Sequence, residues 1–278
     1  MARARFVLSA FGDEIADDLA TQLEVLASED VRHLEFRGAW GRNILDLDGD
    51  QLGRAAALLG EHGFGVSAIG SPIGKSELAQ PLDFELERLD RAITAANALG
   101  TRIIRVFSFF IRDGAFEQHR DEVLRRMRVL TERAEGAGMT LVHENEKGIY
   151  GDVPERCQEL VATIDSPALR MAFDPANFVQ VGVRPMEQGW PLLASLTTHV
   201  HIKDARFSGE VRPAGEGEGD VPGLLVALAD RGYQGFLTLE PHLQIAGPAG
   251  GWSGEQGMRT AVRVLRRLLD VVQDVEIS

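Results

Sequence analysis

The sequence predicts a single (β/α)₈ barrel that uses the whole chain, residues 1–278. Eight short runs rich in β-branched and aromatic residues alternate with eight longer segments whose apolar residues recur at helical spacing. No low-complexity segment, charge block or linker divides the chain, and one barrel of this length is ordinary. An open doubly wound sheet is the alternative. It is disfavoured because the units are nearly equal and no Gly-x-Gly-x-x-Gly motif follows the first strand.

The elements follow in chain order, with glycine turn signals before several strands. The predicted strands lie at residues 6–11, 33–37, 65–70, 102–107, 140–145, 170–174, 198–204 and 235–241. The predicted helices lie at residues 17–29, 50–62, 84–99, 116–137, 154–164, 186–196, 221–232 and 254–272.

The seventh predicted strand, "THVHIKD", separates ionisable from apolar residues. Alternation puts His199, His201 and Lys203 on one face and Val200 and Ile202 on the other. In a barrel one face lies inside and the other under helices, and active sites form where the strands end. We therefore expect the ionisable residues to face the barrel axis near its top. Burying such groups without a purpose is costly.

The last four predicted strands each end in a potential metal ligand. These are Glu144, Asp174, His201 and Glu240, spaced by 30, 27 and 39 residues, about one βα unit each. Three carboxylates and one imidazole suit Mn²⁺, Mg²⁺ or Co²⁺, whereas tetrahedral zinc fits less well. The alternative is that each residue forms its own salt bridge or hydrogen bond, without a shared metal. The position of all four residues at the ends of consecutive strands disfavours that alternative.

The motifs "HENEKG", "FDPANF", "HIKDA", "GEGEGD" and "LTLEPH" resemble those of the xylose-isomerase-like barrels. That family includes sugar phosphate isomerases, ketose 3-epimerases, hydroxypyruvate isomerases and inosose dehydratases, and the resemblance spans nearly the whole chain. It implies one divalent metal per chain, with Mn²⁺ expected first and Mg²⁺, Co²⁺ or Zn²⁺ as alternatives. The implied ligands are Glu144, Asp174, His201 and Glu240.

The chain departs from the ketose epimerases at two places. Asn177 stands where those enzymes usually carry a histidine, and their substrate-binding arginine has only an approximate counterpart in Arg206 or Arg212. These departures put the epimerase substrate set in question and leave the metal site as expected.

The expected reaction is isomerisation or epimerisation of a keto sugar or related polyol ketone through an enediolate. The metal would stabilise the enediolate, while Glu144 and Glu240 remove and return the proton from opposite faces. The alternative is a lyase or dehydratase that uses the same site on a keto sugar, an inosose or a 3-keto-glycoside. In that case His242, Lys203 or Glu146 would protonate the leaving group.

Further side chains are expected to contact the substrate. The candidates are Glu35, Arg37, Glu146, Asn177, Lys203, Arg206 and His242. For several of them the competing interpretation is a buried ion pair or a hydrogen bond at the rim. The glycine-rich stretch 245–257 follows the last strand, where barrels often bind phosphate. Its alternative role is a lid or a subunit contact around Trp252.

Composition excludes several other classes of protein. Lys and Arg number 29 against 42 Asp and Glu, and the net charge of −13 argues against nucleic-acid and anionic-membrane partners. A phosphodiesterase related to apurinic endonucleases would need more histidines than the seven present. A metal-free sugar-binding barrel remains an alternative.

Cysteine usage and the first residues bear on location and assembly. Cys157 is the one cysteine, so no internal disulfide forms and a reducing compartment fits. The first apolar run stops at Gly12, too short for a signal peptide or a membrane span. We expect a cytoplasmic homodimer or homotetramer acting on a small sugar.

Overall fold

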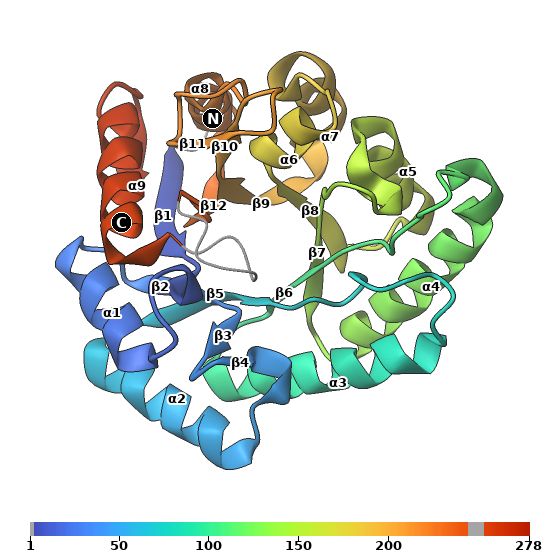
Figure 1. Cartoon of the computed structure of the whole chain (residues 1–278), viewed down its shortest axis with the longest axis horizontal. Helices are drawn as coiled ribbons and strands as arrows, with labels where there is room; N and C mark the ends of the chain where they lie inside the picture. The colour runs from blue at the N-terminus through green and yellow to red at the C-terminus, as the bar shows by residue number, and fades with distance from the viewer. Residues whose placement is uncertain (1–2, 244–252) are drawn as a thin grey trace.

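The computed structural model describes residues 3–243 and 253–278. Eight parallel strands form a closed ring, because β12 pairs with both β9 and β1 (Figure 1). The barrel strands are β1 (Ala4–Ala10), β2 (His33–Phe36), β5 (Gly65–Gly70), β6 (Ile103–Val106), β7 (Thr140–Glu144), β8 (Leu169–Phe173), β9 (Thr197–Ile202) and β12 (Gln234–Leu239). The predicted (β/α)₈ barrel is confirmed.

Helices surround this ring. They are α1 (Leu19–Ser28), α2 (Gly49–His62), α3 (Leu82–Leu99), α4 (Phe116–Gly136), α5 (Pro154–Ile164), α8 (Val221–Asp230) and α9 (Gly254–Leu269). Apolar residues on their inner faces pack against the outward side chains of the strands, such as Leu34, Val200 and Ile202. In the part of the chain that the structure describes, no helix combines the length and apolarity needed to cross a bilayer.

The connection after β8 differs from the predicted single helix at residues 186–196. It contains α6 (Pro175–Gln180), a π-helical turn (Pro185–Gly189) and α7 (Trp190–Leu193). Asp174 caps α6 by accepting a hydrogen bond from the Asn177 amide, and Pro175 occupies the first helical position. This strand-to-helix junction holds Asp174 at the barrel mouth.

Two short hairpins extend the strand ends. One consists of β3 (Gly38–Ala39) and β4 (Arg42–Asn43), and the other of β10 (Asp204–Ala205) and β11 (Val211–Arg212). The Asp204 carboxylate accepts hydrogen bonds from the amides of Ala205, Gly215, Gly217 and Gly219. These amides are therefore already bonded to a carboxylate and are not available to bind an anion such as phosphate.

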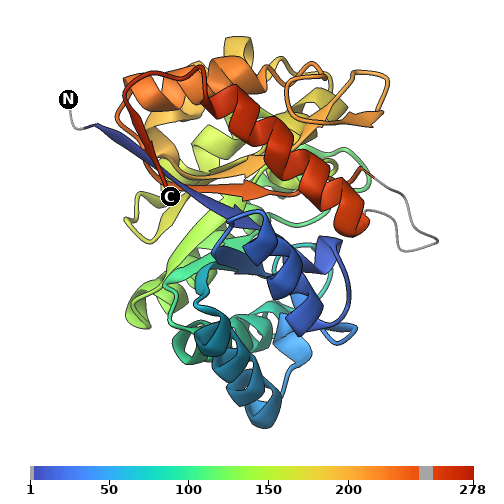
Figure 2. The same ribbon diagram turned by 90° about the vertical axis from the view of Figure 1, so that its left-hand side faces the viewer.

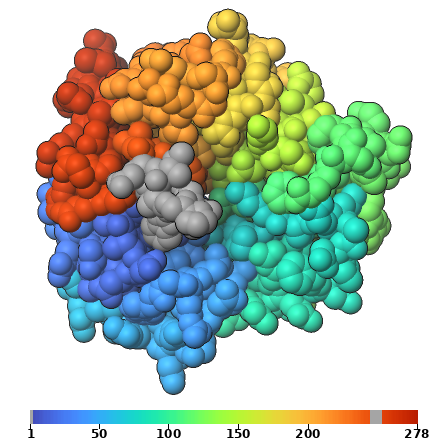
Figure 3. Space-filling view, viewed as in Figure 1, coloured from blue at the N-terminus to red at the C-terminus, as the bar shows by residue number. Residues whose placement is uncertain are grey.

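The two ends of the chain close the structure. β13 (Val275–Ile277) pairs in parallel with the beginning of β1, so both termini lie at the amino end of the barrel strands (Figure 2). α9 packs beside α1, and the two ends of the chain, coloured red and blue, adjoin on the surface (Figure 3). Glu29, which follows α1, accepts hydrogen bonds from Arg259 and Arg263 of α9. The carboxyl end of the barrel is thus the end at which loops and hairpins gather.

Candidate active site

Four potential ligands lie together at the carboxyl end of the barrel. Each of Glu144, Asp174, His201 and Glu240 offers one ligand atom, and these atoms all lie within 4.8 Å of one another. All four side chains are buried. His201 Nδ1 lies 3.2 Å from Glu144 Oε1 and 3.9 Å from Glu240 Oε2. We call these residues the four-residue cluster.

Hydrogen bonds between neighbouring loops hold two members of this cluster in place. The Asn145 side chain donates to the Asp174 carbonyl at 2.8 Å and accepts from the Asp174 amide at 3.0 Å. Asn177 Nδ2 donates to Glu144 Oε1 at 3.0 Å and to the Asn145 carbonyl at 2.9 Å. Asn177, at the position where ketose epimerases usually have histidine, thus contacts the cluster directly.

The donor atoms fit a divalent cation. His201 Nδ1 and Asp174 Oδ2 are buried, face the cluster and have no hydrogen-bond partner among the described residues. Lys203 Nζ lies 2.8 Å from Asp174 Oδ2 as an ion pair, but it donates its hydrogen bond to Glu240. The His201 ring nitrogen and this one oxygen of Asp174 are therefore suitable ligands for such a metal.

Three buried or half-buried cations neutralise the carboxylates. Arg105 donates to Glu144 Oε2 at 2.6 Å, whereas Arg37 and Lys203 donate to the two oxygens of Glu240 at 2.7 and 3.0 Å. The sequence analysis missed Arg105. Its signal was alternation, because an arginine between Ile104 and Val106 occupies the inward-facing position of the strand.

Burial raises the pKa of each carboxylate in the cluster, but nearby cations offset this effect to different extents. Burial raises the pKa of Glu144, but His201 and Arg105 outweigh it and leave that pKa well below its usual range. Burial is likewise outweighed at Glu240 by Lys203, His242 and Arg37, so its pKa is lowered. Burial raises the pKa of Asp174 to about 6, with Lys203 opposing it. Both proposed acid/base carboxylates are therefore anionic at neutral pH.

A second group of ligand-type residues lies beside the cluster. His242 Nε2 is 2.9 Å from Glu14 Oε1 and 3.5 Å from Glu240 Oε1. Arg37 also contacts Glu14 and Glu240, at 3.1 and 2.7 Å, so a guanidinium already supplies the positive charge there. We interpret this group as a hydrogen-bonded wall of the site.

The remaining predicted substrate residues are distributed unevenly. Glu146 pairs with Lys75 at 2.6 Å, and the Lys75 ammonium lies 4.4 Å from the centre of the Phe107 ring. Arg206 is half exposed and faces Glu210 on its own hairpin, outside the cluster. Glu35 is fully buried beneath the cluster and contacts histidines there. Trp252, expected at a subunit contact, lies outside the described residues.

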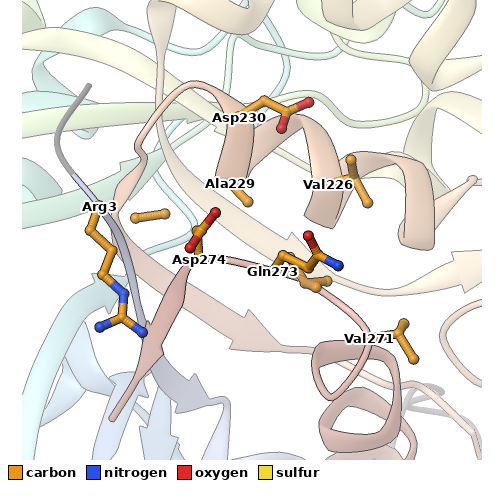
Figure 4. Close-up of a pocket in the computed structure, with 9 residues that line it drawn as sticks. Arg3, Val226, Ala229, Asp230, Val271, Gln273 and Asp274 are labelled. Atoms are coloured by element: carbon orange, nitrogen blue, oxygen red, sulfur yellow. The ribbon is translucent and has the colours of Figure 1, made fainter.

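Neither of two surface cavities lined by described residues includes a member of the four-residue cluster. A cavity of about 680 Å³ lies at the opposite, amino end of the barrel, where Arg3, Asp230 and Asp274 line it (Figure 4). A smaller cavity of about 270 Å³ opens beside Asp13 and Arg37 at the mouth. We place the candidate site by its chemistry, because the larger cavity contains none of the grouped ligand residues.

Solved structures share this fold. A D-tagatose 3-epimerase-like protein matches with a TM-score of 0.75 and 20% identity, over 97% of this chain and 99% of its own. The IOLI protein with a bound zinc atom matches with a TM-score of 0.76 and 15% identity, over 95% and 98%. The probable 3-DHS dehydratase AsbF of Bacillus anthracis, involved in petrobactin synthesis, matches with a TM-score of 0.71 and 16% identity, over 95% and 98%.

The sequence comparisons are consistent with this architecture. No curated protein matches the chain. The family model described as xylose isomerase-like TIM barrel matches residues 23–268. The protein therefore belongs to the xylose isomerase-like TIM barrel family.

Proposed function

We propose that this protein is a divalent-metal-dependent isomerase or epimerase of a keto sugar or related polyol ketone. The observation that carries the proposal is the pair of buried carboxylates Glu144 and Glu240. They extend from β7 and β12 on two sides of His201, and nearby cations lower the pKa of both. Two carboxyl groups at one small site can serve proton transfer at two faces of a planar intermediate, one as the base and the other as the group that passes a proton back.

The four-residue cluster would hold the cation. A divalent metal bound by Glu144, Asp174, His201 and Glu240 would act as a Lewis acid toward adjacent carbonyl and hydroxyl oxygens of the sugar. Mn²⁺ is the metal we expect first. The related structure with bound zinc keeps Zn²⁺ among the candidates.

The side chains of this protein would then move the proton. One of Glu144 and Glu240 would remove the α-proton and become a carboxylic acid, leaving an enediolate. In an isomerisation the same carboxylic acid would return the proton to the neighbouring carbon. In an epimerisation with Glu144 as the base, Glu240 would pass a proton from Lys203, which donates to it, to the opposite face, and the proton held by Glu144 would leave to solvent while solvent reprotonates Lys203. Lys203 and Arg105, each within 3.0 Å of one of these carboxylates, hold them ionised and add positive charge beside the developing enediolate.

A lyase is the second candidate, and the proton donors around Glu240 favour it. Lys203 Nζ and His242 Nε2 lie 3.0 and 3.5 Å from Glu240 oxygens. After the same proton abstraction, either group would protonate a departing β-hydroxyl or glycosyl oxygen. The likeness of the fold to the probable dehydratase AsbF is compatible with this alternative.

A screen of keto sugars in deuterium oxide separates the two reactions. Metal-loaded protein is incubated with neutral ketoses, their phosphate esters, inososes and 3-keto-glycosides, and products are identified by NMR. An epimerase gives an isomer carrying solvent deuterium at the reacting carbon, whereas a lyase releases water or an alcohol. Exhaustive chelation should abolish either activity, and unchanged turnover of the chelated protein would contradict the proposal.

A further inference from the structure

The two ring nitrogens of His201 face different partners. Nδ1 points to the four-residue cluster, 3.2 Å from Glu144 Oε1, whereas Nε2 lies 3.2 Å from Glu35 Oε2. Both His201 and Glu35 have 0% exposure. When Nδ1 binds a metal through its lone pair, the one hydrogen left on the ring lies on Nε2, from which it is donated to Glu35.

Glu35 is itself fixed by a second histidine. His199 Nε2 lies 2.7 Å from the same Glu35 oxygen, and Thr238 Oγ1 lies 3.1 Å from that nitrogen. Thr238 is also the register partner of His201, on the neighbouring strand β12. The ring nitrogens of His199 and His201 therefore share the one Glu35 oxygen as their partner.

The orientation of the His201 ring is restricted from two sides. The His199 ring meets it edge-on with centres 5.4 Å apart, and Phe11 meets it edge-on at 5.3 Å. A half-turn of the ring about the Cβ–Cγ bond would exchange Nδ1 with Cδ2 and Nε2 with Cε1. The hydrogen bond from Nε2 opposes this flip. Glu35 is the acceptor of that bond.

The position of Glu35 comes from the closure of the barrel. β2 and β9 are separated by β1 and β12 around the ring, so the Glu35 side chain crosses the interior beneath the cluster to reach the histidines. Glu35 Oε1 has no hydrogen-bond partner among the described residues. A buried carboxylate with one oxygen unpaired costs free energy of folding, so packing alone does not account for it.

We propose that Glu35 is a positioning residue of the metal centre: it accepts the Nε2–H of His201, fixes the tautomer and plane of that ring, and makes Nδ1 a stronger ligand. The inference rests on the proposed function, because it requires that His201 binds a metal. It also assigns Glu35 a role other than the substrate contact expected from the sequence. Carboxylate partners of ligating histidines typically contribute about 10–100-fold to metal affinity.

Metal titration without substrate tests the inference. The dissociation constants of Mn²⁺ and Co²⁺ are measured by calorimetry for the parent protein, Glu35→Ala, Glu35→Gln and His201→Ala. We expect Glu35→Ala to raise the constant by about 10–100-fold. Glu35→Gln should raise it less, because its amide oxygen still accepts the hydrogen bond but carries no charge. His201→Ala should raise it most.

Glu85→Gln is the matched control. Glu85 is fully buried on α3, where it bonds to Ser76 and Arg88 outside the candidate site. Its replacement removes a buried charge from the same protein without touching the cluster, so the metal affinity should stay within about twofold of the parent. This separates a local effect at His201 from a general loss of stability.

The outcomes separate two claims, the positioning role of Glu35 and the binding of a metal by His201. Parent-like affinity of Glu35→Ala beside a large loss in His201→Ala overturns the positioning role and leaves the metal site intact. Parent-like affinity of His201→Ala overturns the metal site and with it the proposed function. If Glu35→Ala does not fold, Glu35→Gln decides: an altered visible spectrum of bound Co²⁺ supports the inference, and an unchanged spectrum and affinity contradict it.

Discussion

The two halves of the barrel contribute opposite charges to the same site. The strands of the second half, β7, β8, β9 and β12, place the four-residue cluster of Glu144, Asp174, His201 and Glu240 at their carboxyl ends. The first half supplies Arg37 after β2 and Arg105 on β6, which bond to Glu240 and Glu144. A cluster of carboxylates is therefore assembled by one half of the chain and neutralised largely by the other.

This difference has an energetic reason. Carboxylates buried side by side repel one another and lose hydration, so the fold needs cations close to them whether or not a metal is bound. Lys203 is the cation that the second half supplies itself, between Asp174 and Glu240. If the comparison is right, replacing a carboxylate of the cluster should have the largest effect on turnover. Replacing one of the first-half arginines that bond to the cluster should lower stability and, through the changed charge of the carboxylates, reduce catalysis to a smaller degree.

The largest effect is expected in the second half, at the two proposed acid/base residues. Glu240→Gln keeps the shape and one oxygen donor but removes the proton acceptor. Turnover should fall by roughly 10²–10⁴, while metal affinity falls moderately. Glu144→Gln should behave alike, and one of the two variants should still exchange the substrate α-proton with solvent deuterium. Steady-state kinetics and NMR measure these effects.

Glu146→Gln is a suitable control for these variants. Glu146 is a carboxylate near the same strand end, but it pairs with Lys75 at the rim. Its replacement should reduce turnover far less than that of Glu240. Near-parental turnover of Glu240→Gln would contradict the assignment of Glu240 as an acid/base residue and, with it, the comparison between the two halves.

A large effect on stability is expected in the first half, at Arg105. Arg105→Met removes the buried partner of Glu144 and should lower the free energy of unfolding of the metal-free protein by about 3–5 kcal/mol. Because the cluster then carries more uncompensated negative charge, adding Mn²⁺ should stabilise this variant more than it stabilises the parent. Urea denaturation with and without metal measures both quantities.

Arg133→Met provides the contrast for Arg105. Arg133 forms an exposed ion pair with Asp90 between α4 and α3, and such pairs contribute roughly 0–1 kcal/mol. Equal losses in the two variants, or equal stabilisation by metal in parent and Arg105→Met, would contradict the assignment of Arg105 as the counter-charge of the cluster.

The smallest effect is expected at Arg206, which the family resemblance nominated as a substrate residue. Because Arg206 is half exposed and faces Glu210, Arg206→Ala should change kcat/KM by less than about fivefold, the equivalent of about 1 kcal/mol. Arg37→Met, which removes a contact to Glu240, should lower kcat/KM by more than about tenfold, the equivalent of about 1.4 kcal/mol. A larger loss of kcat/KM in Arg206→Ala than in Arg37→Met would show that the cationic side chain that contacts the substrate comes from the second half.

The sequence by itself determined the barrel and the four-residue cluster. Alternation in residues 198–204 predicted that His199, His201 and Lys203 share the inner side and that Val200 and Ile202 meet the helices, as the structure has them. The spacing of about one βα unit predicted that the ligand-type residues meet at one end. Both inferences depend on the local periodicity of apolar residues, which can be read directly from a sequence. They also depend on the parallel strands that alternating strands and helices imply.

The tertiary structure decided which charges meet across the barrel. The bonds from Arg105 to Glu144, from Arg37 to Glu240 and from His201 to Glu35 join residues 39, 203 and 166 positions apart. The inward-facing parity of Glu35 was readable from its strand, but its partner was not, because several strand ends face the same interior. Closure of the ring, with its particular register and tilt, brings one pair of side chains within hydrogen-bonding distance and separates the others.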